Sequence, residues 1–344
     1  MARRREAKLN EASGAAQADA GRASAGQVVV IGTIDGAGVD LLCQRAGIGV
    51  RQFHRVRPER LPAIIADADA LIVRTAEITA ETVHAARRLR IVARYGVGYD
   101  NIDVSALSAR GIPLATVGDA NAVPVAEHAM AMLLALAKRV PELDRTVRTG
   151  GWAVRNSAST WELAGRTILL VGLGRVGRAM ARRCLAFDLR VIAVDPALSA
   201  DAMAALGVEK RETLAGALAE ADIVSLHLPL SAQTRGLIGV RELAAMRPGA
   251  VLINTARGGI VDEDALRDAL RRNRLAGAAL DVFAQEPPAV DDPLLAEGRL
   301  LLAPHHAGLT RECVRRMSLV CARNVLAALD GAPDRRFVVN PEVL

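Results

Sequence analysis

A glycine-rich loop is the clearest motif with chemical meaning in this sequence. It has the spacing GxGxxG and consists of Gly172, Gly174 and Gly177. The loop follows the apolar run 167–171 and opens a helix expected over 175–187. The first glycine permits a tight turn, the second lets the backbone approach a pyrophosphate, and the third lets helix and strand pack closely. Because a helix N-terminus attracts anions, the loop predicts a dinucleotide ligand.

Asp195 supplies the second feature of a dinucleotide site. It follows the apolar run 190–194 and lies about 20 residues beyond the glycines. A carboxylate at this point accepts hydrogen bonds from the adenosine ribose and repels a 2′-phosphate. Since no arginine occupies the next few positions, the sequence favours NAD over NADP. The competing interpretation is a strand-to-helix turn that binds nothing.

Polar side chains follow three further apolar runs. Arg257, then Asp281 and Glu286, then His305 each come shortly after one of these runs. Hydride transfer to or from a C–O bond needs a group that moves a proton and a cation that polarises a carbonyl and holds a carboxylate. Because ligands of parallel sheets bind beyond the carboxyl ends of the strands, we expect these side chains to converge on one cleft.

The elements that must position these residues form an alternating pattern from residue 27 onward. Short apolar, β-branched runs alternate with helical stretches, which predicts an α/β protein with parallel sheets covered on both faces. Asp262 is the expected N-cap of a helix over 262–273. The expected strands are 28–32, 70–74, 90–94, 167–171, 190–194, 222–226, 250–254, 276–280 and 299–303.

Two longer helices, expected over 123–150 and 309–331, interrupt the alternation. Long helices that flank one block of strands allow a chain to leave a domain and to return to it. We therefore expect one domain to be inserted into another. The expected divisions are a disordered tail over 1–26, the first part of a substrate domain over 27–122, a nucleotide-binding domain over 123–308, and a return segment over 309–344.

Composition excludes several other classes of protein. The 344 residues are 51% hydrophobic and 24% charged, and no apolar run approaches the length that spans a bilayer. The four cysteines form no CxxC pair, so neither a zinc site nor a disulfide framework is expected. The net charge of +6 comes with only 2% aromatic residues, which argues against nucleic-acid binding. We expect a cytoplasmic protein with no metal, no membrane and no nucleic-acid partner.

In combination, the motifs resemble those of the D-isomer-specific 2-hydroxyacid dehydrogenases, the family of phosphoglycerate dehydrogenase and of hydroxypyruvate or glyoxylate reductase. The resemblance covers residue 27 to the C-terminus and rests on GxGxxG with its later Asp, NTARGGIVDEDAL, ALDVFAQEPP and PHHAGLT. It implies two doubly wound parallel-sheet domains, with a Rossmann NAD domain inserted into a flavodoxin-like substrate domain. It also implies NAD-dependent interconversion of a D-2-hydroxy acid and its 2-keto acid, and a homodimer built through the NAD domain.

The same resemblance implies roles for individual residues. His305 is the expected general acid and base, Glu286 its hydrogen-bond partner, and Arg257 the ligand of the substrate's carboxylate and carbonyl oxygen. Asp281 is expected to orient the nicotinamide carboxamide. His306 is the alternative base, but the family usually has an aliphatic residue at this second position.

Cofactor and substrate contacts follow from the resemblance in the same way. The expected cofactor contacts are Gly172, Gly174, Arg175, Val176, Gly177, Asp195, His227, Leu228, Pro229, Thr234, Thr255, Ala256, Arg257, Asp281, His305 and Gly308. The expected substrate contacts are Arg74, Thr75, Val97, Gly98, Arg257 and His305. Arg74 either meets a second anionic group of the substrate or is a solvated arginine. His128, on the first long helix, is expected to be a packing residue, and Asn121 resembles the family's residue near the nicotinamide.

Two function classes stay open on the sequence alone. The first is the dehydrogenase, with a substrate of the 3-phosphoglycerate or glycerate/hydroxypyruvate type. The second is an NAD(H)-sensing binding protein of the corepressor type with little turnover, because such proteins share the fold and can retain Arg257, Glu286 and His305.

Overall fold

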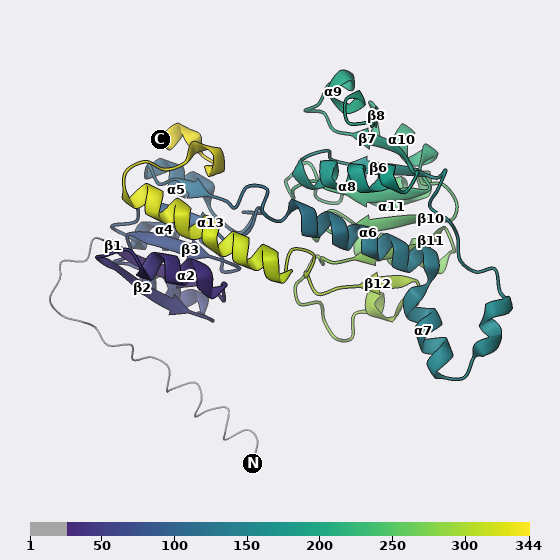
Figure 1. Ribbon diagram of the computed structural model, residues 1–344, viewed down its shortest axis with the longest axis horizontal. Helices are drawn as coiled ribbons and strands as arrows, with labels where there is room; N and C mark the ends of the chain where they lie inside the picture. Colours follow the sequence, from purple (N-terminus) through teal and green to yellow (C-terminus); the bar gives the residue numbers. More distant parts are fainter. Residues whose placement is uncertain (1–25) are drawn as a thin grey trace, which may run out of the picture.

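The computed structural model describes residues 26–344, which form two lobes, each built on its own sheet (Figure 1). The expected tail over 1–26 lies outside the described residues, except for Gly26, which begins the first strand. The expected fold class is confirmed, since all strand pairs within the two sheets are parallel.

The first sheet has five strands in the order β2-β1-β3-β4-β5, which is the flavodoxin-like arrangement. Its apolar central strands agree with the expected ones to within two residues at each end, whereas β2 and β5 were not expected. The bounds are β1 (Gly26–Ile31), β2 (Ile48–Phe53), β3 (Ala70–Val73), β4 (Ile91–Arg94) and β5 (Leu114–Ala115).

Helices from both ends of the chain cover this sheet. The C-terminal helix α13 (Arg311–Leu329) packs beside α2 (Gly36–Cys43), as Figure 1 shows. Gly38 allows this close approach, because a Cβ there would collide with Ser318, whose hydroxyl donates to the Asp35 carbonyl at 2.6 Å. The remaining helices are α3 (Leu61–Ile65), α4 (Ala80–Ala85), α5 (Val104–Ala109) and the 3-10 turns η1 (Pro58–Arg60), η4 (Arg335–Phe337) and η5 (Pro341–Val343).

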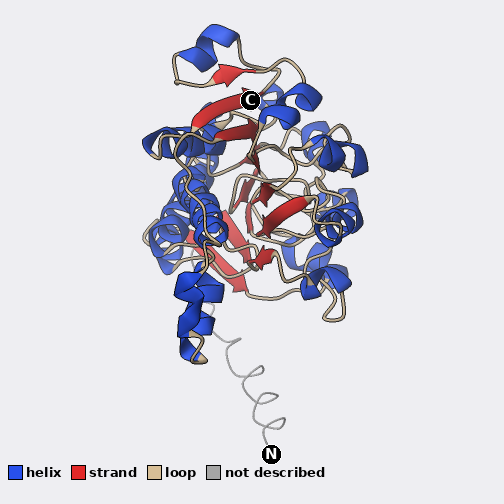
Figure 2. Cartoon of the chain, turned by 90° about the vertical axis from the view of Figure 1, so that its right-hand side faces the viewer, coloured by secondary structure: helices blue, strands red, loops and turns tan. Residues whose placement is uncertain are grey.

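The second sheet has seven strands in the order β12-β11-β10-β9-β6-β7-β8, with helices on both faces (Figure 2). The strand order reverses between β6 and β9, which is where a doubly wound sheet binds its ligand. The bounds are β6 (Thr167–Val171), β7 (Arg190–Val194), β8 (Glu209–Lys210), β9 (Ile223–Leu226), β10 (Ala250–Asn254), β11 (Leu275–Leu280) and β12 (Leu300–Leu302).

Two helices of this lobe begin at expected positions. Asp262 caps α12 by accepting from the Ala265 amide, and α8 starts directly after the glycine loop. The bounds of the helices in this lobe are α6 (Ala122–Lys138), α7 (Val140–Arg148), η2 (Trp152–Asn156), α8 (Arg175–Ala186), α9 (Ala200–Ala204), α10 (Leu214–Glu220), α11 (Val240–Ala245), α12 (Glu263–Arg271) and η3 (Pro293–Ala296).

The single helix expected over 123–150 is wrong. The helix breaks at Arg139, whose φ of 50° lies in the left-handed region, and a second helix starts beyond it. Pro141 accounts for the break, because its ring would collide with the Ala137 carbonyl in a continuous helix. The Trp161 amide donates to that carbonyl instead, at 3.0 Å.

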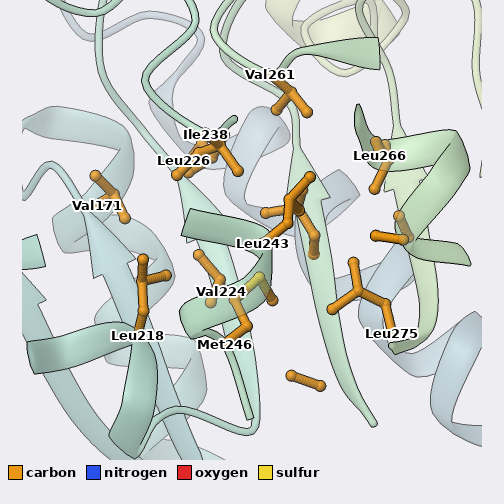
Figure 3. Close-up of a cluster of buried hydrophobic side chains, with 14 of the residues drawn as sticks. Val171, Leu218, Val224, Leu226, Ile238, Leu243, Met246, Val261, Leu266 and Leu275 are labelled. Atoms are coloured by element: carbon orange, nitrogen blue, oxygen red, sulfur yellow. The ribbon is translucent and has the colours of Figure 1, made fainter. Parts of the chain in front are cut away.

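Strands buried on both faces hold each lobe together. All five residues of β6 are buried, as are those of β9 and β10. Figure 3 shows one of the clusters on the second sheet, where Val224 and Leu226 of β9 pack with Leu243 and Met246. Burial of such side chains contributes about 1.5–3 kcal/mol each, so the strands are a rigid base for the loops at their ends.

We propose the domain boundaries expected above, with 27–122 and 309–344 around the first sheet and 123–308 around the second. The two separate sheets and the packing of α13 against α2 support this division.

Within residues 26–344, none of the helices has the length and apolar composition to cross a membrane.

Candidate active site

A cleft of about 530 Å³ lies at the carboxyl ends of both sheets. Most of the expected site residues line it: Arg74, Thr75, Val97, Gly98, Arg175, Val176, His227, Leu228, Pro229, Thr255, Ala256, Arg257, Asp281, Glu286, His305 and Gly308. The lining also includes Arg94, Tyr95, Asn121 and Val125. The expected residues outside this lining are Gly172, Gly174, Gly177, Asp195 and Thr234.

His305 and Glu286 form the central polar pair of the cleft. The Nδ1 atom of His305 lies 2.7 Å from Oε2 of Glu286, which leaves Nε2 available to a ligand. The other carboxylate oxygen accepts from the Phe283 amide at 3.1 Å. Burial alone would raise the pKa of Glu286, but the hydrogen bonds from His305 and Phe283 outweigh it and lower the pKa. Glu286 is therefore ionised at neutral pH, and the imidazole has a charged partner.

The backbone at His305 is held in an unusual conformation. Its φ of 51° lies in the left-handed region, which few residues other than glycine adopt. Asp281 fixes it by accepting three consecutive amides: His305 on the carbonyl at 2.7 Å, and His306 and Ala307 on the two carboxylate oxygens at 2.7 and 2.9 Å. The carboxylate of Asp281 is therefore an anchor for the loop. Its expected contact with a nicotinamide carboxamide stays a prediction.

Arg257 reaches across the cleft from the end of β10. Its Nε donates to Oδ1 of Asp100 at 3.0 Å, and its Nη1 donates to the Ala256 carbonyl at 2.6 Å. Burial would raise the pKa of Asp100, but the charge and the hydrogen bond of Arg257 lower it. Gly98 makes room for this guanidinium, because a Cβ there would overlap it. The Nη2 atom beside Gly98 makes no hydrogen bond to the described residues and can meet an anionic ligand.

Two further arginines, Arg74 and Arg94, also line the cleft. Arg94 ends β4 and donates to the Tyr95 carbonyl, while Arg74 donates to the Thr33 carbonyl at 2.9 Å. Burial, together with repulsion from Arg257, lowers the pKa of Arg94 to about 10. Arg94 still carries its charge at neutral pH. Three guanidinium groups beside one cavity suit a ligand with more than one anionic group.

Sequence reasoning missed Arg94 and Asp100 as parts of the site. Arg94 is the last residue of β4 and Asp100 lies in the loop that follows, of which only Val97 and Gly98 were singled out. The sequence contains a pattern that could have indicated them, because charged residues at positions 94 and 100 flank the two glycines of RYGVGYDNID. What the sequence could not show is that this loop meets Arg257 from the other lobe.

The glycine loop has the geometry of a pyrophosphate cradle. Gly172 has a φ of 93°, and a Cβ there would lie 2.5 Å from the His227 carbonyl oxygen. At Gly177 a Cβ would overlap the Gly172 carbonyl, whereas at Gly174 it would meet no atom of the described chain within 4 Å. The open side at Gly174 is the N-cap of α8, so the residues present fit a bound dinucleotide.

Asp195 lies where a ribose-binding carboxylate is expected. It follows β7, and its two oxygens accept the amides of Leu173 at 2.8 Å and Ala197 at 2.9 Å. The contact with Leu173 joins the carboxylate to the glycine loop and fixes the distance between the two. The residues that would hold an adenosine ribose and its pyrophosphate are thereby brought together.

Two of the expected cofactor contacts have clear structural partners of their own. His227 is bonded to the Ser225 hydroxyl at 2.9 Å, and burial lowers the pKa of its imidazole to about 4. It is therefore neutral at pH 7. Thr234 donates to the Pro229 carbonyl at 2.6 Å and accepts from the Ser231 amide. It shapes the loop next to the cleft, and its contact with a cofactor stays a prediction.

Comparison with known proteins identifies the class. A family described as D-isomer specific 2-hydroxyacid dehydrogenase, NAD binding domain, matches residues 130–307. A glyoxylate reductase of Korarchaeum cryptofilum is 43% identical over 81% of this chain and 85% of its own length. The chain therefore belongs to the D-isomer specific 2-hydroxyacid dehydrogenase family, and its second lobe is the family's NAD-binding domain.

Other relatives extend the similarity to more of the chain. D-3-phosphoglycerate dehydrogenase of Archaeoglobus fulgidus is 37% identical over 92% of this chain, and that of Mycobacterium tuberculosis strain H37Rv is 42% identical over 83%. This chain spans only 60% and 55% of their lengths. Among solved structures, the NADPH-dependent glyoxylate/hydroxypyruvate reductase of Sinorhizobium meliloti, in complex with citrate, aligns with a TM-score of 0.81 at 30% identity. That alignment covers 92% of this chain and 97% of the other.

Proposed function

We propose that this chain is an NAD-dependent dehydrogenase that interconverts a D-2-hydroxy acid and its 2-keto acid. The observation that carries the proposal is the convergence of the His305–Glu286 pair and Arg257 in one cleft beside the glycine loop. Relatives named glyoxylate reductase and D-3-phosphoglycerate dehydrogenase support the reaction class. A corepressor-type NAD(H) sensor is not favoured, because no relative considered above carries such a name.

The residues that line the cleft have the following proposed roles in the reaction. Arg257 binds the carboxylate and the carbonyl oxygen of the keto acid, together with the backbone amides of Val97 and Gly98. A bound nicotinamide supplies the hydride. His305 gives its proton from Nε2 to the substrate oxygen, and Glu286 stabilises the charged imidazole before this transfer. In the oxidation direction the same imidazole takes up the hydroxyl proton.

NAD is the proposed cofactor, in preference to NADP. Asp195 places a negative charge beside the ribose position, and a 2′-phosphate there would be repelled. The solved relative from Sinorhizobium meliloti is described as NADPH-dependent, so the family includes both preferences and Asp195 carries the argument for this chain.

The proposed substrate carries a second polar or anionic group at its far end. Arg74 and Arg94 line the cleft from the lobe of the first sheet, and they supply two positive charges in addition to that of Arg257. Compounds of the 3-phosphoglycerate and glycerate/hydroxypyruvate type meet this requirement with a phosphate or a hydroxyl group, whereas a simple keto acid such as pyruvate has no second polar group to meet either guanidinium.

We also propose that the protein forms a homodimer and is located in the cytoplasm. Helix α7 and the turn η2 project from the second lobe and contain no buried residue (Figure 1). The segment exposes Val140, Val147 and Trp152, and exposed apolar groups on a projecting segment are typical of an interface. The four cysteines are free thiols, which suits a reducing compartment.

A panel of keto acids tests the proposal directly. NADH and NADPH oxidation would be measured with glyoxylate, hydroxypyruvate, 3-phosphohydroxypyruvate and pyruvate. We expect turnover with NADH at least about tenfold faster than with NADPH, and slower turnover of pyruvate than of the compounds with a second polar group. Absence of NADH oxidation with every compound would refute the enzyme and favour the sensor. A preference for NADPH would refute the role given to Asp195.

A further inference from the structure

Helix α6 contacts the catalytic loop through one face. Asn121, Val125 and His128 are spaced four and three residues apart, so they lie on the same side of the helix. A Cβ added at Gly308 would be 3.7–3.8 Å from Asn121 and Val125, which places the loop against the first turns of α6. His128 is the next residue along this face. The groups around the His128 side chain show whether it has a role besides packing.

The imidazole of His128 is directed at a buried charge. Its Nε2 lies 3.6 Å from Oδ1 of Asp281, whose side chain is fully buried. Nε2 is itself buried and makes no hydrogen bond to any other described residue. Burial of an unpaired polar nitrogen costs free energy, and an inward movement of a few tenths of an ångström would give a normal hydrogen bond. A pure packing role does not explain why this nitrogen faces a carboxylate.

Asp281 connects this contact to the catalytic imidazole. The same Oδ1 accepts the His306 amide at 2.7 Å, and Oδ2 accepts the Ala307 amide at 2.9 Å. The Asp281 carbonyl accepts the His305 amide at 2.7 Å. The left-handed conformation of His305 therefore depends on how Asp281 is held. Among the described residues, the hydrogen bonds recorded to this carboxylate come from backbone amides, and His128 is the side chain that faces it.

We propose that His128 is a positioning residue for the reaction, which acts through Asp281 on the loop that carries His305. Its Nε2–H donates to Oδ1 of Asp281 and orients the carboxylate, which holds the loop amides and keeps the His305 ring over the substrate. The inference deepens the proposed function and rests on it. It goes beyond the expectation that His128 is a packing residue.

Two substitutions separate positioning from packing. His128→Leu keeps the bulk and removes the donor, whereas His128→Gln places an amide donor where Nε2 lies. We expect kcat to fall about tenfold or more in the leucine variant, because small misplacement of a catalytic group is costly, with KM for the keto acid changed less than about threefold. The glutamine variant should recover kcat to within about threefold of wild type. Glu127→Gln, at the exposed neighbouring position, is the matched control and should be unaffected.

Amide hydrogen exchange provides a readout that does not depend on activity. In peptides covering 303–310, the amides of His306 and Ala307 should exchange about tenfold faster in His128→Leu than in wild type, while His128→Gln stays close to wild type. Unchanged exchange and unchanged kcat in His128→Leu would overturn the inference. An equal loss of kcat in His128→Leu and His128→Gln would also overturn it. If the wild type turns over no keto acid, the proposed function fails, and the exchange result still decides whether His128 fixes the loop.

Discussion

At the scale of single residues, the site depends on a few carboxylates that fix cationic or imidazole partners. Glu286 holds His305, and Asp100 holds Arg257. Asp281 fixes a backbone conformation at His305 that costs about 1–3 kcal/mol in an unsupported non-glycine residue. Such strain is characteristic of sites where the direction of one side chain matters more than stability.

The charge of Glu286 predicts a pH effect on catalysis. Because the pKa of Glu286 is lowered by His305 and Phe283, its stabilising contact with the imidazole is present above its usual pKa of 4.5 and is lost as the pH falls through the lowered value. In Glu286→Gln the imidazole loses its ionised partner, and the contact no longer depends on the charge of residue 286. We expect kcat for reduction to be about tenfold lower at pH 7, and the pH profile of reduction to differ from that of wild type.

The measurement is kcat/KM for keto acid reduction between pH 5 and about 10, with circular dichroism as a control for folding. An unchanged profile in the glutamine variant would show that the Glu286 carboxylate does not act on His305.

At the scale of elements, apolar runs predicted the strands well, and the failures have physical causes. Strand β2 has no fully buried residue, so its sequence IGVRQF lacks a continuous apolar run. Strand β5 has two residues and depends on a distant partner, since Ala115 pairs with Val338 of the C-terminal segment. No local pattern indicates such a pairing. The break at Arg139 was predictable from Pro141, which the helical periodicity of 123–150 concealed.

Asn340 predicts a stability effect where the C-terminal segment pairs with β5. Its Oδ1 accepts the Leu114 amide at 2.8 Å, and its Nδ2 donates to the Ile112 carbonyl and the Ser108 hydroxyl at 3.0 Å. Asn340→Leu leaves buried backbone groups unpaired, so the free energy of unfolding should fall by about 1–3 kcal/mol. Urea denaturation measures the loss, with the exposed Gln233→Leu as control. Equal stability of the two variants would contradict this role, and kcat should be unchanged in both.

At the scale of the whole molecule, the site exists because two sheets direct their carboxyl ends at one cleft. Sequence motifs supplied the chemical groups of the second lobe, namely the glycine loop, Arg257 and His305. The motifs could not predict which residues of the two lobes are in contact. The pairing of Arg257 with Asp100 and the packing of α6 on the catalytic loop depend on how the lobes and elements meet, which residue spacing alone does not determine.

The projecting segment of α7 and η2 predicts the oligomeric state. We expect the protein to have twice the chain mass of 36.3 kDa in size-exclusion chromatography with light scattering. Val147→Glu places a charge on the exposed apolar face of α7 and should weaken the dimer at least about tenfold. Val240→Glu introduces the same change at an exposed site on α11 and should leave the mass unchanged. A monomeric wild type, or equal effects of both variants, would contradict an interface on this segment.

The most direct test of the whole account compares binding and turnover in His305→Ala and His306→Ala. Both proteins would be titrated with NADH and assayed with the best keto acid. The account predicts that His305→Ala loses turnover by about 1,000-fold while its Kd for NADH changes less than about threefold, and that His306→Ala turns over at close to the wild-type rate. Undiminished turnover in His305→Ala, or a loss confined to His306→Ala, would contradict the assignment of proton transfer to His305.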